Sequence, residues 1–348
     1  MRAKLRLLFL GANILLVLLT LGAYLAPHIP PQRTALFPIL GLGYPVLLLC
    51  HLLSIILWIL MRSRWVLLSA VTLLIGIQSC SRLIGISLPD KISSEAITVA
   101  TFNANFSKPI TLGEPDKLAS REDGFIQYLR SLPQMDVLCV QEDGEASSRY
   151  LQDALAFPHR HAHADLTVSI YSALPILDAG HVEFSSTTAN TCLWVDVVKG
   201  SDTLRIYTTH LESNRTDGVV PEVIHEDTPE HMSSSLLMGI GKHHQRFSIK
   251  RADQAHLIKA HQSSSPYPAL ICGDFNETPQ SHVYHLLSED MQDTFAEEGT
   301  GMASTFGERI PALRIDHVLV DKRVDVLRHD IHRSGYSDHY LVEVVIAL

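Results

Sequence analysis

Cysteine is scarce in this sequence, and its placement argues against a domain stabilised by disulfides or by a structural zinc ion. The five cysteines stand singly at positions 50, 80, 139, 192 and 272, and no Cys-x-x-Cys pair is present. Disulfide scaffolds and structural zinc sites need paired or regularly spaced cysteines. Because free cysteine is among the most buried residue types, we interpret these residues as buried thiols.

Positive charge is also in short supply. The chain has 28 Lys and Arg against 37 Asp and Glu, a formal net charge of −9. Seven of the cations and one acid lie in residues 1–90, which leaves 21 basic and 36 acidic residues, a formal charge of −15, for residues 91–348. Proteins that bind duplex nucleic acid tightly usually show a basic face. The balance argues against strong capture of DNA, although a nuclease that binds weakly and turns over stays open.

Long apolar runs are missing from residues 91–348 and are concentrated before them. Three runs are present, at about 7–26, 36–60 and 65–79. The first two reach the roughly 20 residues needed to cross a bilayer, and the third is near the minimum. We therefore expect residues 1–90 to form a multi-pass membrane anchor with three transmembrane helices in contact with a lipid bilayer. A cleaved signal peptide is the alternative for the first run, but the run exceeds the usual length of roughly 7 to 15 residues.

The three runs contain no Asp, Glu, Lys or Arg, which argues against a transport pathway through them. Cations favour the cytoplasmic side, and they lie at the amino-terminal tip and at Arg62 and Arg64. With three spans, residues 91–348 would be extracytoplasmic, in the periplasm of a Gram-negative cell. Arg82 and Lys91 lie on the exported side against this trend.

Residues 91–348 contain no internal repeat and no low-complexity tract. Eight short apolar runs read as strands: ITVATFN, DVLCVQ, TVSIYSA, TCLWVDVV, TLRIYTTHL, ALICGDF, RIDHVLV and YLVEVVIAL. Two stretches have the mixed charge and apolar spacing of surface helices, REDGFIQYLRSL and HHQRFSIKRADQAHLIKAHQ. The pattern predicts one α/β domain of about 250 residues.

The stretch 213–241 is too polar and broken for a core element, and a connection of this length is usually functional or disordered. It carries His225 and His231, with His243 and His244 just beyond. Their spacings match no metal-ligand pattern, so we interpret them as solvated loop histidines.

Acids, amides and imidazoles recur at the boundaries of the predicted strands: Asn103, Asn105, Glu142, His210, Asp274, Asn276, Asp316, Asp338 and His339. Each has an ordinary explanation as a turn residue, a solvated acid or a structural histidine. Their repetition at strand ends favours a site, because a rigid scaffold can bring such residues together.

This set of residue types suits phosphoester hydrolysis with a hard cation. Oxygen ligands without cysteine favour Mg²⁺, or Mn²⁺, over Zn²⁺. The metal would neutralise the phosphate, a carboxylate would orient or deprotonate the attacking water, and imidazoles can move protons near neutral pH.

Six blocks carry a family resemblance: TFNAN, QE, THLES, GDFN, RIDHVLV and SDHYLV. In this order they resemble the signature blocks of the endonuclease/exonuclease/phosphatase superfamily, the DNase I-like metallohydrolases, over residues 97–348. SIYSALPI also falls where many relatives have a strand ending in Pro-Ile. The resemblance implies a four-layer sandwich, in which two mixed sheets pack face to face with helices outside.

The resemblance also implies roles for the metal-side residues. Glu142 would be the main Mg²⁺ ligand, with Asn103 and Asp338 close to the metal or the phosphate. Asp274 would position or activate the attacking water.

The remaining residues would face the substrate. Asn276 would contact the phosphoryl group, and His339 would lie beside the scissile phosphate, oriented by Asp316. His210 matches the histidine found in the DNase I-like and sphingomyelinase-like branches. Asn105 is assigned to substrate binding, at a position that varies in residue type.

Taken together, these features predict a membrane-anchored hydrolase of phosphoester bonds, foremost a phosphodiesterase or endonuclease. The alternatives are a lipid head-group phosphodiesterase, a small-molecule phosphatase, or a catalytically inactive membrane scaffold of the same fold. Ala173 and Leu174 stand where many relatives carry a serine and a basic residue, so the resemblance does not fix which substrate fits. We infer no obligate protein partner.

Overall fold

The computed structural model describes residues 2–87, 95–104, 116–163, 167–184, 190–213, 234–307 and 313–348. The chain forms two compact units. One, called here the sandwich unit, comprises residues 82–211, 254–276 and 287–348. The other, called the helical unit, comprises residues 1–81, 212–253 and 277–286. The expected boundary near residue 90 lies outside the described residues.

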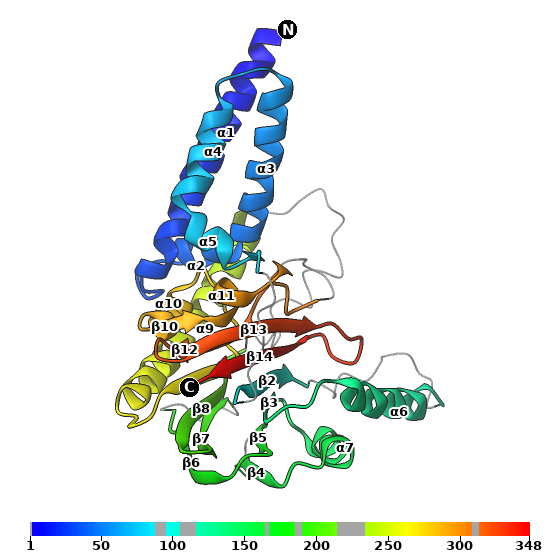
Figure 1. Cartoon of the computed structure of the whole chain (residues 1–348). Helices are drawn as coiled ribbons and strands as arrows, with labels where there is room; N and C mark the ends of the chain where they lie inside the picture. Colours follow the sequence, from blue (N-terminus) through cyan, green and yellow to red (C-terminus); the bar gives the residue numbers. More distant parts are fainter. Residues whose placement is uncertain are drawn as a thin grey trace. The chain divides into compact units, whose positions relative to one another are not determined.

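Two six-stranded sheets build the sandwich unit (Figure 1). Sheet I has the order β13 (Asp325–His332), β14 (Leu341–Ala347), β2 (Ile97–Asn103), β3 (Val137–Gln141), β5 (Val168–Ser172) and β4 (His159–Ala162). Sheet II has the order β10 (Met291–Asp293), β12 (Asp316–Asp321), β9 (Ala269–Asp274), β8 (Asp202–His210), β7 (Thr191–Lys199) and β6 (Ile176–Val182). Both sheets are mixed, because β2 pairs with β3 and β8 with β9 in parallel while the other pairs are antiparallel.

Alternation along the strands places one apolar face of each sheet against the other. Val99 and Ile170 of sheet I share a fully buried core with Ile206 and Leu270 of sheet II. Burial on this scale is the main stabilising term for such a domain, since each fully buried aliphatic side chain contributes about 1.5–3 kcal/mol.

Helices cover the outer faces of the two sheets. Phe125 of α6 (Asp116–Ser131) and Leu151 of α7 (Glu145–Leu155) pack in a second apolar cluster with Phe102 of sheet I. On sheet II, the outward-facing Tyr207 hydroxyl lies 2.9 Å from Nδ1 of His261, in the carboxyl-terminal half of α9 (Ser234–Ser263). The expected α/β arrangement of two mixed sheets flanked by helices is thus confirmed.

Strand direction brings the polar strand ends together. The parallel pairs end in register, Asn103 beside Gln141 in sheet I and His210 beside Asp274 in sheet II. The antiparallel β12 begins opposite the same point, because Asp316 pairs with Asp274. One end of the sandwich therefore collects side chains from both sheets.

Helices make up most of the helical unit (Figure 1). They are α1 (Arg2–Leu25), η1 (Ala26–His28), α2 (Leu36–Leu42), α3 (Tyr44–Leu60), α4 (Val66–Ile75) and α5 (Ile77–Ser81), with α10 (His282–Ser288) and the first part of α9. The remaining elements, β1 (Ile84–Gly85), β11 (Gly301–Met302) and α11 (Thr294–Glu298), belong to the sandwich unit.

The expectation of three transmembrane helices is wrong. Among the described residues, α1 alone is long and apolar enough to cross a membrane, and α2 and α3 could count as one more span only despite a 60° bend. The second run breaks at Gly43, two residues before Pro45 in the first turn of α3, and the third breaks at Gly76. Glycine and proline interrupt helices locally even where the hydropathy is continuous.

Two smaller expectations also need correction. Helix α9 begins at Ser234, so the end of the stretch expected to be a loop is helical, and His244 is buried on it rather than solvated. Residues 214–233, with His225 and His231, lie outside the described residues. Among the cysteines, those in β3, β7 and β9 are buried as expected, whereas Cys50 on α3 is exposed.

Candidate active site

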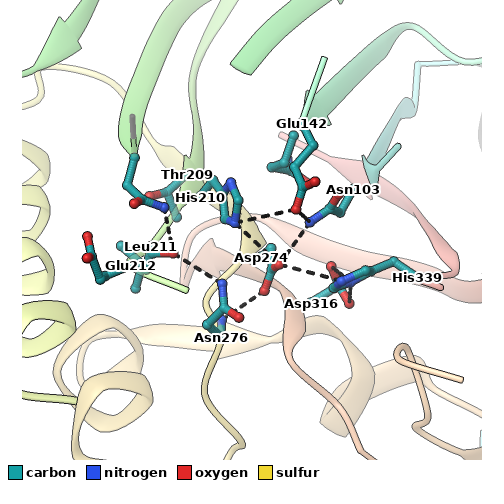
Figure 2. Close-up of polar contacts among 12 residues, drawn as sticks. Asn103, Glu142, Thr209, His210, Leu211, Glu212, Asp274, Asn276, Asp316 and His339 are labelled. Atoms are coloured by element: carbon teal, nitrogen blue, oxygen red, sulfur yellow. Dashed lines mark hydrogen bonds and ion pairs between the residues drawn. The ribbon is translucent and has the colours of Figure 1, made fainter. Parts of the chain in front are cut away.

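Most of the predicted polar residues, apart from Asn105 and Asp338, lie at the shared end of the two sheets (Figure 2). Asn103 stands between two carboxylates, since its Nδ2 donates to Glu142 Oε1 at 3.2 Å and to Asp274 Oδ2 at 3.0 Å. Asn103 and Asp274 are buried, while the Glu142 side chain is 32% exposed. The amide thus joins an acid of sheet I to an acid of sheet II at a place that solvent reaches from one side.

The backbone is strained where it presents these groups. Glu142 and Asn276 have φ values of 53° and 52°, in the left-handed region that side-chain-bearing residues rarely adopt. Gly273 has φ 127°, and a Cβ there would lie 2.0 Å from the Thr209 carbonyl oxygen, so only glycine fits. Strain of about 1–3 kcal/mol per residue persists only where the surroundings impose it, and it clusters at functional sites.

Asp143, which was not among the predicted residues, fixes the conformation of the turn that follows β3. Its buried carboxylate accepts hydrogen bonds from the hydroxyls of Ser147 (3.0 Å), Ser148 (2.9 Å) and Tyr171 (2.8 Å), and Arg160 lies 3.4 Å away. Asp143 N also donates to the Thr167 carbonyl. A carboxylate tied to this many groups fixes the turn that carries Glu142. Its only signal in the sequence is its place in the QED triplet.

His339 and Asp316 form a buried pair. Nδ1 of His339 lies 3.0 Å from both Asp316 carboxylate oxygens, and Nε2 lies 3.7 Å from Asp274 Oδ2. Burial alone would lower the pKa of His339, but the Asp316 and Asp274 carboxylates outweigh it and raise this pKa to about 10. The raised pKa favours the protonated imidazole at neutral pH, and its Nδ1 faces the Asp316 carboxylate.

Two hydroxyls hold the segments that carry this pair. Ser337 Oγ donates to the Asn103 carbonyl at 2.8 Å and accepts from the His339 amide at 3.0 Å. Thr305 Oγ1 accepts from the backbone amide of Asp316 at 3.1 Å. Ser337 belongs to the SDH block, whereas no sequence signal marks Thr305. Asp338 is half-buried, and its charge adds to the raised pKa of His339.

His210 is aimed into the same space. Its buried Nε2 lies 3.7 Å from Asp274 Oδ2 and 4.0 Å from Glu142 Oε1, and it has no hydrogen-bond partner among the described atoms. A buried ring nitrogen without a partner is costly, so its position favours contact with a ligand group. Two hydrogen bonds fix Asn276. Its backbone N–H donates to Asp274 Oδ1 at 2.8 Å, and its side-chain Nδ2 donates to the Leu211 carbonyl at 3.1 Å.

Two sets of side chains could hold a metal ion here. Ligand atoms of Asp274, Asp316 and His339 lie within 4.8 Å of one another. However, Nδ1 of His339 is occupied by Asp316, and a protonated imidazole repels a cation. The second set, Glu142 and Asn103, offers oxygen atoms without a protonated ring beside them and fits a hard divalent cation better. Asn105 lies outside the described residues.

These features define a two-sheet sandwich with acid, amide and imidazole groups gathered at one end. The chain belongs to the Endonuclease/Exonuclease/phosphatase family, whose model matches residues 100–339. Residues 6–83 match a second model, described as a domain of unknown function (DUF8431). No curated protein matches the chain.

Solved structures with the same fold share little sequence with this chain. TDP2 from D. rerio, complexed with a single-strand DNA product, is 16% identical, with a TM-score of 0.54 over 73% of this chain and 100% of that one. A family protein from Bacteroides thetaiotaomicron is 16% identical, with a TM-score of 0.52 over 75% and 99%. The mannosyl-6-phosphatase of B. thetaiotaomicron VPI-5482 is 17% identical, with a TM-score of 0.50 over 72% and 100%. At these identities the likeness extends to the fold alone.

Proposed function

We propose that this chain is a membrane-anchored, Mg²⁺-dependent phosphodiesterase, foremost a nuclease, whose active site lies at the Asn103 end of the sandwich unit. One observation carries the proposal. The Asn103 amide bridges the carboxylates of Glu142 and Asp274, and two imidazoles, His210 and His339, face the same carboxylate of Asp274 at 3.7 Å.

In this proposal Glu142, Asn103 and Asp338 hold Mg²⁺, and Mn²⁺ can replace it. The bound ion supplies positive charge that neutralises the phosphate and the departing oxygen. Glu142 suits this role because its carboxylate is partly exposed on a fixed, strained turn. The fit comes from the oxygen-only donor set, which a hard cation prefers.

Asp274 orients the attacking water and takes its proton. One of its oxygens is fixed by the Asn276 amide, and the other faces Asn103 and both imidazoles. A carboxylate in this position can act as a general base. Asn276 then contacts the phosphoryl group through its side-chain amide.

The imidazoles stabilise negative charge on the phosphoryl oxygens. His339 is held as a cation by Asp316, so its Nε2–H is a donor at neutral pH. His210 offers the ring nitrogen that has no hydrogen-bond partner among the described atoms. Preorganised donors of this kind act strongly in a site that excludes most water. Asn105 stays a predicted substrate contact.

Four considerations bear on the substrate class: two relatives by fold, the charge of the catalytic domain and the proposed anchor. A relative by fold, TDP2, was solved with a single-strand DNA product, which favours a phosphodiester of nucleic acid. A second, the mannosyl-6-phosphatase, makes a phosphomonoester of a small molecule the next candidate. The formal charge of −15 on residues 91–348 fits weak binding with turnover better than tight capture of DNA. A lipid head group is a further candidate because of the anchor.

We further propose that residues 1–90 anchor the catalytic domain, residues 91–348, to a bilayer. Helix α1 has the length to cross, and its large outward side chains are apolar, for example Leu15 and Leu18, which are 57% and 61% exposed. The cations at the amino-terminal tip favour the cytoplasmic side. One crossing by α1 then places the catalytic domain outside the cytoplasm.

Activity of the detergent-solubilised full chain tests the catalytic proposal. We expect Mg²⁺-dependent nicking of supercoiled plasmid and cleavage of bis(p-nitrophenyl) phosphate, both abolished by a chelator and by Asp274→Asn. Asp202→Asn, at the exposed opposite end of the strand that carries His210, should leave both activities intact. Cleavage of p-nitrophenyl phosphate or sphingomyelin vesicles alone would move the substrate to monoesters or lipid head groups. Metal binding without turnover on any of these would support the inactive scaffold.

A further inference from the structure

We propose that the helical unit positions the active site, by holding the turn of residues 277–282 that directly follows Asn276 in the chain. This inference rests on the proposed function, since it assigns an effect on catalysis. It gives a role to the segment that matches a domain of unknown function. The supporting contacts all lie within the helical unit.

Side chains of the turn cap the ends of the amino-terminal helices. The last carbonyls of a helix have no partner within the helix and need one elsewhere. Gln280 Nε2 donates to the Ala23 carbonyl of α1 at 3.1 Å, and Thr278 Oγ1 donates to the Gly41 carbonyl of α2 at 3.3 Å. His282 Nδ1 lies 2.8 Å from the Pro27 carbonyl of η1 and donates to it. Three consecutive segments of the helical unit are therefore tied to one short turn.

Gly41 shows how close this approach is. A Cβ on Gly41 would lie 2.4 Å from the Gln280 carbonyl oxygen, which is backbone and cannot rotate away. Gln280 and Thr278 are 3% and 2% exposed, so the contact is also closed to water. Any larger residue at position 41 must displace either α2 or the turn.

At its other end, the turn is held by an ion pair and a hydrogen bond between Glu277 and helix α9. The Glu277 carboxylate accepts from Arg251 Nε at 2.9 Å and from Ser248 Oγ at 2.6 Å, both on α9. Arg251 is fully buried and also donates to the Glu212 carbonyl at 2.8 Å. The turn thus has one geometry, fixed at Glu277 by α9 and at residues 278–282 by the amino-terminal helices.

Asn276 is covalently joined to the first residue of this turn. Its φ of 52° is unfavourable and persists only if its flanking residues are fixed. A shift of the turn would release Asn276 and, through its amide hydrogen bond, Asp274. Misplacing catalytic groups by about 1 Å can cost on the order of 100-fold in rate.

A matched pair of glycine substitutions in the full-length chain tests the inference. Gly41→Ala forces α2 and the turn apart, whereas Gly11→Ala adds the same methyl group on α1, where a Cβ meets nothing within 4 Å. We expect Gly41→Ala to lower kcat at least tenfold and to speed amide hydrogen exchange over residues 274–282, with the Mg²⁺ activation constant unchanged because Glu142 and Asn103 lie outside the turn. Gly11→Ala should match the wild type in all three measurements.

Gln280→Met is the second variant, because it keeps a side chain of similar length but removes the donor to Ala23. It should also lower kcat and speed amide exchange over residues 274–282, but by less. If Gly41→Ala does not fold, this variant still tests the inference. A kcat equal to that of Gly11→Ala in both variants, with faster exchange, would overturn the positioning role. Unchanged exchange would overturn the docking itself. An inactive wild type would instead contradict the proposed function, and the exchange comparison would still decide whether the turn is held.

Discussion

The two units differ in the side chains that they expose and in where they bury polar ones. The sandwich unit packs aliphatic residues between its sheets, and among its described residues few large apolar side chains are exposed, Leu177 being one at 62%. The helical unit exposes apolar side chains along α1, α3 and α4 and buries polar ones between them. Asn13 accepts from Ser69 at 2.9 Å, and Thr20 Oγ1 lies 2.9 Å from Nε2 of His51.

This difference shows that a buried polar group does a different task in each unit. In the sandwich, the polar groups of the candidate site gather at one end, two of them on strained backbone, where they can meet a substrate. In the helical unit they join helices that otherwise offer only apolar surface, as helices in a bilayer do. Under the proposed function, the same residue types serve chemistry in one unit and join helices in the other.

The largest effect is expected from breaking the buried pair of the active site. Asp316→Asn removes the charge that orients His339 and keeps it protonated, so we expect kcat/KM on the diester substrate to fall about 10³-fold, within the range of acid–base contributions. Asp325→Asn, at an exposed position in the same unit, is the control. A loss below tenfold would show that the pair is structural, which unfolding measurements would then have to confirm.

The same leucine-to-lysine substitution at an exposed position of each unit tests whether the apolar surface of α1 contacts a membrane. Leu18 on α1 and Leu177 on β6 are 61% and 62% exposed. Leu18→Lys should weaken membrane insertion by about 2.5–3.5 kcal/mol, the cost of a charge at the centre of a span, and shift protein from the membrane to the soluble or degraded fraction. Leu177→Lys should leave fractionation unchanged. Equal behaviour of the two variants would contradict anchoring through α1.

A buried histidine makes the sandwich interior sensitive to acid. Burial, aided by the charge of Arg314, lowers the pKa of His329 to about 3, and its Nδ1 lies 2.8 Å from Thr294 Oγ1. The unfolded chain binds a proton at this residue near pH 6.5 and the folded chain does not, so its contribution is complete above pH 6.5 and is lost as the pH falls toward 3.

The free energy of unfolding should therefore drop by about 2 kcal/mol between pH 6.5 and pH 5 through this residue, at about 1.4 kcal/mol per pH unit. His329→Leu should remove this part of the slope. Urea titrations of both proteins at pH 6.5 and pH 5 measure it, and parallel losses would show that His329 is not the group responsible.

The sequence predicted all the inner strands of the two six-stranded sheets. All eight predicted runs form strands, because strands buried on both sides read as continuous apolar runs. The strands that were missed include β4, β6, β10 and β13, which are the four edges of the two sheets. Edge strands are paired on one side only and interleave polar residues, as HRHA and DVLRHDIH show.

The site was predictable where a residue ends a strand or belongs to a family block. Asn103, Glu142, Asp274 and His339 all meet this condition, and the structure brings them together. Supporting residues were missed because their partners come from distant elements, which no local pattern reveals. The same holds for the breaks at Gly43 and Gly76, since hydropathy does not register a bend.

Asp143 is the supporting residue with the sharpest test. Asp143→Asn keeps its shape but weakens the hydrogen bonds from Ser147, Ser148 and Tyr171 that fix the turn of Glu142. We expect the dissociation constant for Mg²⁺, measured by calorimetry without substrate, to rise about tenfold, the lower end for groups that orient a ligand. Asp178→Asn, on the exposed part of β6, should bind Mg²⁺ like the wild type. Unchanged affinity in Asp143→Asn would remove Asp143 from the site's support.

The smallest effect concerns the buried pair between α1 and α4. Asn13 and Ser69 are 3% and 0% exposed, and their hydrogen bond lies among apolar side chains. Such bonds in membrane proteins average only about 0.6 kcal/mol, because the unfolded chain in the membrane also finds partners. A double-mutant cycle of Asn13→Ala and Ser69→Ala in lipid bicelles should give a coupling energy near this value. A coupling above about 2 kcal/mol would mean that the unfolded state offers no such partners, as for a bond closed off from both water and lipid. In that case the helical unit would bury its polar groups at the same cost as the sandwich, and the contrast between the two units would lie in their surfaces alone.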